Sequence, residues 1–198
     1  METKGLFTKD TVVDVLEGVF IYTENGNFIS PKFWGIHEDH EKATCAAIVN
    51  NGTILLIHPQ DIEEGDVQLL DWEKSQSGKM HESVKDGLTD FNGAGNTKSL
   101  AEAGSEVAKQ VLDLPLLGKP WHIPTLGELQ LMYDNKVMLG AALLIAGQAP
   151  LKDYWYWTST RRSEKSNFAF YWGNGFWGSS NQYCNYRVRP VSALSLTI

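Results

Sequence analysis

The sequence lacks any apolar stretch long enough to cross a bilayer. Its longest apolar run, residues 138–146, is interrupted by Gly140, whereas a transmembrane helix needs about 20 consecutive apolar residues. The first five residues also lack the basic region and apolar core of a secretory signal. We therefore expect synthesis in the cytoplasm without a signal peptide, and no membrane insertion.

Positive charge is also scarce. Against 24 Asp and Glu residues the chain has 17 Lys and Arg, which gives a formal net charge of −7 at pH 7. No basic stripe is available to neutralise phosphates. The composition therefore argues against nucleic acid as a partner and, for the same reason, disfavours acidic membrane surfaces.

Cysteine is rare as well, since only Cys45 and Cys184 are present, far apart in the sequence. We interpret them as two reduced thiols packed as small apolar groups, with a single disulfide between them as the alternative. Nothing in their spacing indicates a cysteine-framed scaffold or a cysteine-ligated metal site.

Two short hairpins are predicted in the first sixty residues. In each, two apolar runs flank an Asn-Gly dipeptide, which accepts the positive φ values that tight turns need. The runs and their turns are 18–22, 24–27 and 28–30, then 44–49, 51–52 and 53–58. With 42% hydrophobic residues in 198, the chain is able to bury the core of one domain.

The central part of the sequence mixes loop and helix signals. Residues 61–96 are polar and Gly-rich, which predicts an irregular loop around Leu69, Leu70 and Trp72. The spacing of apolar residues predicts one helix over 97–112.

Each of two further predicted helices has a sequence signal at one of its ends. Thr125 followed three residues later by Glu128 is a capping-box signature, which predicts a helix that begins after Thr125. Another helix over about 136–146 ends at Gly147, a usual stop residue.

The C-terminal segment is dominated by aromatic residues. More than half of the chain's Phe, Trp and Tyr lie between residues 154 and 186, and residues 166–186 contain no charged side chain. This composition of rings, amides, hydroxyls and glycine is typical of a binding surface. Strand alternation predicts that one set of rings is buried and the other exposed: the core set is Trp157, Phe168, Phe170 and Trp172, and the exposed set is Tyr171, Phe176, Tyr183 and Tyr186.

Several motifs together resemble a known family. They are residues 156–160 (Tyr-Trp-Thr-Ser-Thr), the alternation at 168–172, the turn at 174–175 and residues 186–191 (Tyr-Arg-Val-Arg-Pro-Val). Residues 123–129 and the hairpin at 22–34 add to the likeness. These motifs resemble the variable proteins of diversity-generating retroelements, which have a C-type-lectin fold and include phage tail-fibre receptor-binding proteins. The resemblance covers about 18–194 and is most specific in 154–192.

The resemblance implies a fold and a setting. The expected fold class is α+β, a C-type-lectin fold with a twisted antiparallel sheet, two or three helices and long loops. Residues 1–17 would form an N-terminal attachment or oligomerisation segment, and 18–198 a ligand-binding domain with its variable region at about 154–192. The implied partners are a bacterial cell-surface receptor, either protein or glycan, and phage tail components. The protein would be a homo-oligomer, a trimer in the phage members, located on the virion or a cell surface.

The family's variable codons encode exposed residues, and the interleaved positions hold the scaffold. Carried over to this sequence, the candidate display positions are Arg161, Arg162, Glu164, Asn167, Ala169, Tyr171, Asn174, Phe176, Gly178, Ser180, Tyr183, Asn185 and Arg187. The scaffold positions are Trp157, Phe168, Phe170, Trp172, Val188 and Arg189. The sequence departs from the commonest pattern with Phe168 in place of a frequent Trp and with Trp177 inside the display loop.

Other readings of the same fold remain as alternatives. Formylglycine-generating oxidases need a pair of reactive cysteines, and only Cys184 lies in the corresponding region. Calcium-dependent glycan-binding lectins hold the ion with clustered carboxylates and amides, but residues 172–175 lack the adjacent acid and no Glu-Pro-Asn occurs. Metal-free glycan binding by stacking on exposed rings stays open. We predict no catalytic residue, no metal and no cofactor.

Three polar motifs are expected to be structural. The dense His, Glu and Asp cluster at 37–41 reads as a solvated loop rather than a divalent-ion site. His58 and His122 are expected to be satisfied histidines. Residues 93–97 faintly suggest an anion nest before a helix, but no nucleotide motif accompanies them.

Overall fold

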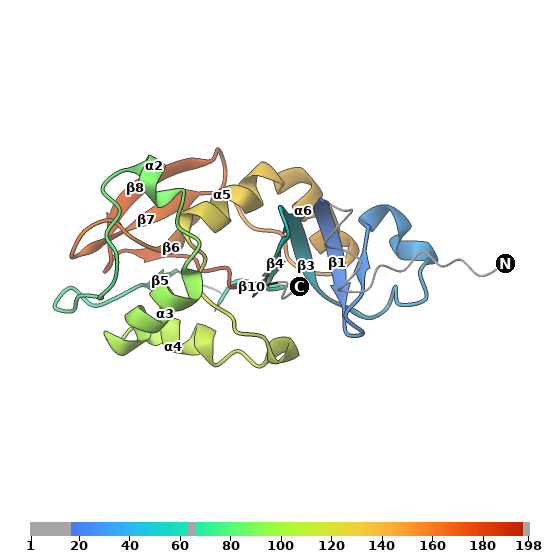
Figure 1. Ribbon diagram of the computed structural model, residues 1–198, viewed down its shortest axis with the longest axis horizontal. Helices are drawn as coiled ribbons and strands as arrows, with labels where there is room; N and C mark the ends of the chain where they lie inside the picture. Colours follow the sequence, from blue (N-terminus) through green and yellow to red (C-terminus); the bar gives the residue numbers. More distant parts are fainter. Residues whose placement is uncertain (1–16, 63–65, 196–198) are drawn as a thin grey trace. The chain divides into compact units, whose positions relative to one another are not determined.

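The computed structural model describes residues 17–62 and 66–195 (Figure 1). The chain groups into two compact units: unit 1 comprises residues 1–59, 135–150 and 193–198, and unit 2 comprises 60–134 and 151–192. The expected attachment segment, residues 1–17, lies outside the described part apart from Glu17. In the described ranges, no helix is both long and apolar enough to span a bilayer.

Unit 1 is built on a five-stranded sheet in the order β10-β4-β3-β1-β2. The pairs β1–β2, β1–β3 and β3–β4 are antiparallel. The strands are β1 (Gly18–Thr23), β2 (Phe28–Ile29), β3 (Ala43–Asn50), β4 (Thr53–Ile57) and β10 (Val191–Ser195). Most of their side chains are buried because these strands are apolar on both faces.

The two predicted hairpins are confirmed. In the second, Asn51 and Gly52 both have positive φ, 47° and 74°, which is the geometry of a two-residue type I′ turn. In the first, Gly26 has a φ of 80° and its N–H donates to the carbonyl of Thr23 at 3.0 Å. The sequence predicted both turns because Asn and Gly tolerate this backbone region at little cost.

One α-helix and one 3₁₀ helix complete the described part of unit 1. The 3₁₀ helix η1 (Pro31–Ile36) follows β2, and α6 (Lys136–Ile145) packs on β1 and β3. The inward face of α6 carries Leu139, Ala142 and Leu143. The helix ends at Ile145, and Gly147, the predicted stop residue, follows with a φ of 71°.

Unit 2 contains a three-stranded antiparallel sheet in the order β6-β7-β8 and a two-stranded ribbon of β5 and β9. The strands are β5 (Val67–Gln68), β6 (Trp155–Arg161), β7 (Ser166–Tyr171), β8 (Phe176–Asn181) and β9 (Asn185–Tyr186). One face of the large sheet packs inward through Tyr156, Phe168 and Phe170, which are all but fully buried. All four rings predicted to be core, Trp157 and Trp172 included, are buried.

The described helices outnumber the two or three expected. Unit 2 alone has α2 (Val84–Gly87), α3 (Gly93–Glu102), α4 (Glu106–Leu112), α5 (Leu126–Asp134) and the 3₁₀ helix η2 (Leu116–Gly118). The single helix predicted over 97–112 is wrong. The helix is interrupted at Gly104, which has a φ of 92°. Ser105 then caps α4, because its hydroxyl accepts the N–H of Ala108 at 3.2 Å.

The predicted capping box at the start of α5 is confirmed. The hydroxyl of Thr125 accepts the N–H of Glu128 at 3.1 Å, and the carboxylate of Glu128 accepts the N–H of Thr125 at 2.7 Å. Glu128 also meets Nε2 of the buried His122 at 3.0 Å. His122 is therefore held at Nε2 by a structural contact, but its Nδ1 is buried without a hydrogen-bond partner among the described residues, so the expectation of a satisfied histidine is met only in part.

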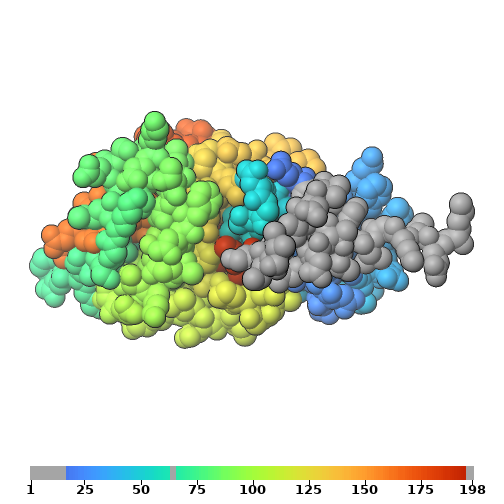
Figure 2. Space-filling view, viewed as in Figure 1, coloured from blue at the N-terminus to red at the C-terminus, as the bar shows by residue number. Residues whose placement is uncertain are grey.

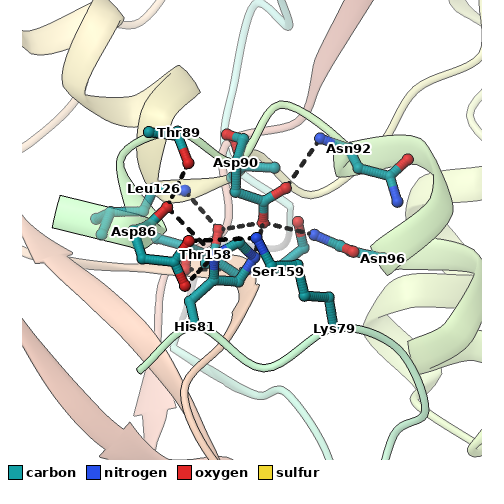
Figure 3. A network of polar contacts seen from close by, with 12 residues as sticks. Lys79, His81, Asp86, Thr89, Asp90, Asn92, Asn96, Leu126, Thr158 and Ser159 are labelled. Atoms are coloured by element: carbon teal, nitrogen blue, oxygen red, sulfur yellow. Dashed lines mark hydrogen bonds and ion pairs between the residues drawn. The ribbon is translucent and has the colours of Figure 1, made fainter. Parts of the chain in front are cut away.

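Within the segment predicted as an irregular loop, 61–96, a buried polar network is centred on Asp90 (Figure 3). Oδ2 of Asp90 accepts the Thr160 hydroxyl at 2.8 Å and the Asn96 amide at 2.9 Å, and Oδ1 accepts the N–H of Asn92 at 3.0 Å. The backbone carbonyl of Asp90 accepts the hydroxyl of Thr125 at 2.7 Å. One residue thus joins α3, α5 and β6.

His81 extends this network to the surface. Its Nδ1 lies 3.2 Å from Asp86 Oδ2 and its Nε2 3.6 Å from Asp90 Oδ2. Lys79 donates to Asp86, and this hydrogen bond holds the pKa of the Asp86 carboxyl below its usual value. The predicted packing around Leu69, Leu70 and Trp72 is half correct: the leucines are buried, but Trp72 is 67% exposed.

The predicted α+β class is confirmed, because antiparallel sheets and helices occupy separate stretches of the chain.

Candidate ligand-binding surface

Six of the candidate display positions lie on one face of the β6-β7-β8 sheet, here called the display face. The register pairs three of them from β7 with three from β8: Asn167 with Ser180, Ala169 with Gly178, and Tyr171 with Phe176. Because side chains alternate across a strand, paired residues two positions apart share a face. The alternation read from the sequence therefore selected one face correctly.

Half of that face is covered, which corrects the expectation for Asn167 and Ala169. Both are buried. The ribbon of β5 and β9 lies over this end of the face: Trp157 donates its indole N–H to the carbonyl of Val67 at 2.8 Å, and its ring lies 4.7 Å from that of Tyr186. Neither Asn167 nor Ala169 is therefore available for display.

Asn167 serves instead as a buried connector. Its side-chain oxygen accepts the amide groups of Gln76 at 2.7 Å and Gln182 at 2.8 Å, and its own amide donates to the carbonyl of Thr158 at 3.2 Å. It thereby fixes two covering segments to β7 and β6. Burial is tolerated because every polar group of the side chain has a partner.

At the other end of the display face, three rings of the sheet and one ring of β9 form a cluster, here called the aromatic rim: Trp155, Tyr171, Phe176 and Tyr186. Trp155 is the centre, with ring centroids 5.5 Å from Tyr171, 6.0 Å from Phe176 and 5.7 Å from Tyr186. The Trp155 and Tyr186 rings are stacked, with 28° between their planes. Phe176 is 58% exposed, and the other three rings are half-buried.

Trp155 was missed as a candidate site residue. The signal was present, because Trp155 lies two residues before Trp157 and alternation puts both on the display face. The exposed Trp177 points to the opposite side of β8 by the same alternation, yet its ring stacks beside Phe176 at 6.2 Å.

Charge occurs only at the edge of the rim. The guanidinium of Arg187 lies 4.7 Å from the ring centroid of the exposed Tyr154. Arg187 also pairs with Asp61 at 3.3 Å and with Asp66 at 3.7 Å. These carboxylates offset its charge, so the rim presents mainly rings and neutral polar groups.

The carboxylate of Asp61 joins several scaffold residues. It accepts Nε of the buried Arg189 at 2.6 Å and the hydroxyl of Tyr156 at 3.2 Å. Burial, together with the Asp61 charge, raises the pKa of Tyr156, so its hydroxyl stays protonated. Arg189 is thus a buried anchor, as predicted.

Three candidate positions lie away from the rim. Arg161 pairs with Asn167 at one end of the sheet, whereas Trp155 pairs with Tyr171 at the other. Arg161 donates to the carbonyls of Ser163 and Gly78, each at 3.0 Å, and Arg162 donates to His81. With the exposed Glu164, they form the far end of the sheet.

Of the remaining candidates, Asn174 and Asn185 are exposed, and Gly178 and Ser180 are half-buried. Tyr183 is 48% exposed and lies beside Trp72. These two rings line a depression of about 480 Å³ and an adjoining one of about 430 Å³. Trp72 was not among the sequence candidates.

The sites of the alternative functions are placed as follows. Cys45 is buried in β3 of unit 1, Cys184 lies between β8 and β9 of unit 2, and neither forms a disulfide within the described ranges. Within the described ranges, no group of three or more His, Cys, Asp or Glu residues is placed to hold a metal ion. In the cluster at 37–41, Asp39 is buried and bonds to Asn25, Asn27 and Lys42.

Comparison with known proteins gives no family. No protein-family model matches the sequence, and no curated protein matches it. Among solved structures, the chain is similar to a fimbrial protein from Bacteroides ovatus, at 13% identity and a TM-score of 0.49. The match covers 89% of this chain and 48% of that one, so the chain spans about half of its length.

Proposed function

We propose that this chain is a non-enzymatic ligand-binding protein that engages its ligand through the aromatic rim. The proposal rests on one observation: Trp155 and the three rings around it form a cluster at one end of the display face, where residues 166–186 contain no charged side chain. Rings on a pleated sheet supply a large contact area with few rotors to immobilise, which lowers the entropic cost of binding.

The finer proposal is a receptor-binding component of the phage tail-fibre type, diversified by a retroelement and assembled as a homo-oligomer. A C-type-lectin scaffold and a bacterial cell-surface receptor belong to the same proposal. Oligomerisation would raise a modest single-site affinity through effective concentration.

The room around the rim supports variation there. A Cβ atom on Gly178 would meet Phe176 at 3.7 Å and Trp155 at 3.8 Å, which is ordinary van der Waals contact. A side chain is therefore tolerated at this position and would extend the ring cluster. Asn167 and Ala169 have no such freedom because both are buried.

The test compares Phe176→Ala with Phe33→Ala for binding to envelope extracts from a panel of bacteria. Phe33 is a matched control, because its ring is 51% exposed and belongs to unit 1. We expect Phe176→Ala and Tyr171→Ala to weaken binding by roughly tenfold or more, and Phe33→Ala to leave it unchanged. Equal effects of Phe176→Ala and Phe33→Ala on binding would contradict the proposal that the ligand binds at the aromatic rim.

Salt and a chelator separate the mechanisms. Binding through uncharged rings should persist at high salt, because charged pairs at the edge are screened and each contributes about 1 kcal/mol or less. Loss at high salt would indicate a charge-driven partner, and loss on addition of a chelator would indicate a calcium-dependent lectin. A reverse-transcriptase gene beside a near-copy of the 154–192 coding segment would support diversification, and the absence of both would count against it.

A further inference from the structure

A second surface lies outside the aromatic rim. Trp72 and Tyr183 together line two adjoining depressions, one with Glu73, Lys165 and Gln182 and the other with Gln68 and Asp71. The depressions, of about 480 and 430 Å³, fall within the range of roughly 300–1,000 Å³ of small-molecule sites. We propose that this surface binds a neutral hexose residue of a glycan without a metal ion.

The exposed state of Trp72 is imposed by its neighbours. Leu69 and Leu70 are buried, and their backbone N–H groups both donate to the carbonyl of Gln182, at 2.9 and 3.0 Å. The segment before Trp72 is thereby joined directly to the residue before Tyr183. Two exposed rings held at fixed places are costly to hydrate, which favours a ligand that covers them.

The same pair of segments is tied to one buried residue. The side-chain oxygen of Asn167 accepts the amide groups of Gln76 and Gln182, one from each segment. Figure 2 shows green residues spread over much of the visible face of unit 2, with orange residues at their margin. The rings are therefore organised before a ligand arrives, which reduces the entropic cost of binding.

The polar groups indicate which ligand fits. A pyranose has an apolar C–H face, which stacks on a ring, and a rim of hydroxyls, which need acceptors and donors. The carboxylates of Asp71 and Glu73 line the depressions and supply acceptors for these hydroxyls, and the ammonium of Lys165 supplies a donor.

The charges select against acidic sugars. The two carboxylates, Asp71 and Glu73, outnumber the single ammonium of Lys165, which also donates to the carbonyl of Lys74 at 2.9 Å. A sialic or uronic acid would meet net negative charge here, whereas a neutral hexose would not. This inference does not depend on the proposed function, because Trp72 lies outside the aromatic rim.

The experiment uses the full chain and defined saccharides. Neutral oligosaccharides of glucose, galactose or mannose, and their sialylated or uronic-acid counterparts, are titrated by calorimetry in the presence of EDTA. We expect a neutral member to bind in EDTA, the acidic counterparts to bind more weakly, and Trp72→Ala to weaken binding by roughly tenfold or more. Trp72→Phe keeps a ring and should retain part of the affinity.

Controls make the outcome decisive. Trp72→Ala is expected to fold, because the side chain is exposed, and its melting temperature verifies this. Phe33→Ala, which removes an exposed ring of unit 1, should leave saccharide binding unchanged. Loss of saccharide binding in Phe176→Ala but not in Trp72→Ala would place the saccharide at the aromatic rim and overturn the inference. The inference is overturned if no neutral saccharide binds, if EDTA abolishes binding, or if Trp72→Ala binds as tightly as the wild-type chain.

Discussion

The ring of Tyr133 lies against the backbone of Gly175, so that a Cβ atom on this glycine would be 2.5 Å from Cε1 of the tyrosine. Tyr133 belongs to α5 and packs on Phe170 and Trp172, with ring centroids 5.4 and 5.6 Å away. Gly175 also has a φ of 76°. The turn between β7 and β8 therefore packs closely on the core, because Gly175 has no side chain to separate its backbone from the Tyr133 ring. Phe176 of the aromatic rim follows directly after this turn.

Two glycines provide a matched test of this contact. We expect Gly175→Ala to destabilise the protein by more than about 1 kcal/mol, because the residue has a positive φ and the new methyl group meets the Tyr133 ring. Gly178→Ala, whose new methyl group would make only ordinary van der Waals contacts with Phe176 and Trp155, should be close to neutral. Urea denaturation midpoints of the two variants test the difference, and equal midpoints would disprove it.

The rings on opposite faces of the sheet should respond differently to truncation. Trp172 is buried against Tyr133 and Phe170, so Trp172→Ala should cost roughly 3–5 kcal/mol. Phe176→Ala should shift stability by far less, because this ring is mostly exposed. Thermal melting separates the two, and an unchanged melting temperature for Trp172→Ala would mean that the faces are inverted.

The capping box of α5 predicts a graded response at Glu128. Glu128→Ala removes the acceptor of the buried Thr125 N–H, and we expect a loss of about 1–3 kcal/mol. Glu128→Gln keeps an acceptor oxygen and should lose less. The control is Glu102→Ala at an exposed helical position, expected to stay within about 0.5 kcal/mol. Chemical denaturation of the three variants measures their free energies of unfolding. The predicted order of stability is wrong if Glu128→Gln and Glu128→Ala are equally destabilised.

Asp39 should make unit 1 sensitive to acid. Hydrogen bonds from Lys42 and then Asn27 hold the pKa of its carboxyl below the usual value. Because the folded pKa is lower than the unfolded one, near 3.9, this stabilisation is present above the unfolded pKa and is lost as pH falls through the folded pKa.

Asp39→Asn should accordingly be less stable than the wild-type chain at pH 6, and the difference should shrink as pH is lowered towards 3. Denaturation midpoints measured at steps of pH follow this change. Glu41→Gln, at an exposed position in the same loop, should track the wild-type curve. A constant gap between Asp39→Asn and wild type across the range would refute the linkage.

Local chemistry explains what the sequence predicted well. The Asn51-Gly52 turn and the Thr125–Glu128 cap are set by groups within four residues of one another, so their geometry follows from residue type. The alternation of β7 likewise selected the face that carries Tyr171 and Phe176. These are interactions of short range along the chain.

Contacts between residues far apart in the sequence explain which features could not be predicted. Alternation states which face Asn167 occupies, but not that Gln76, 91 residues away, lies over it. Trp72 looked like a core residue because it follows Leu69 and Leu70, and only the joining of this segment to Gln182 turns it outward. Such pairings depend on tertiary contacts that no local pattern encodes.

The path of the chain through its two units affects how unit 1 is made on the ribosome. The edge of its sheet next to β4 is completed by β10, which ends at Ser195. Translation delivers about 5–20 residues per second, so β4 waits for some 140 further residues before its neighbour emerges. An unpaired strand edge attracts other chains, and nascent unit 1 is therefore exposed to misassembly for much of its synthesis.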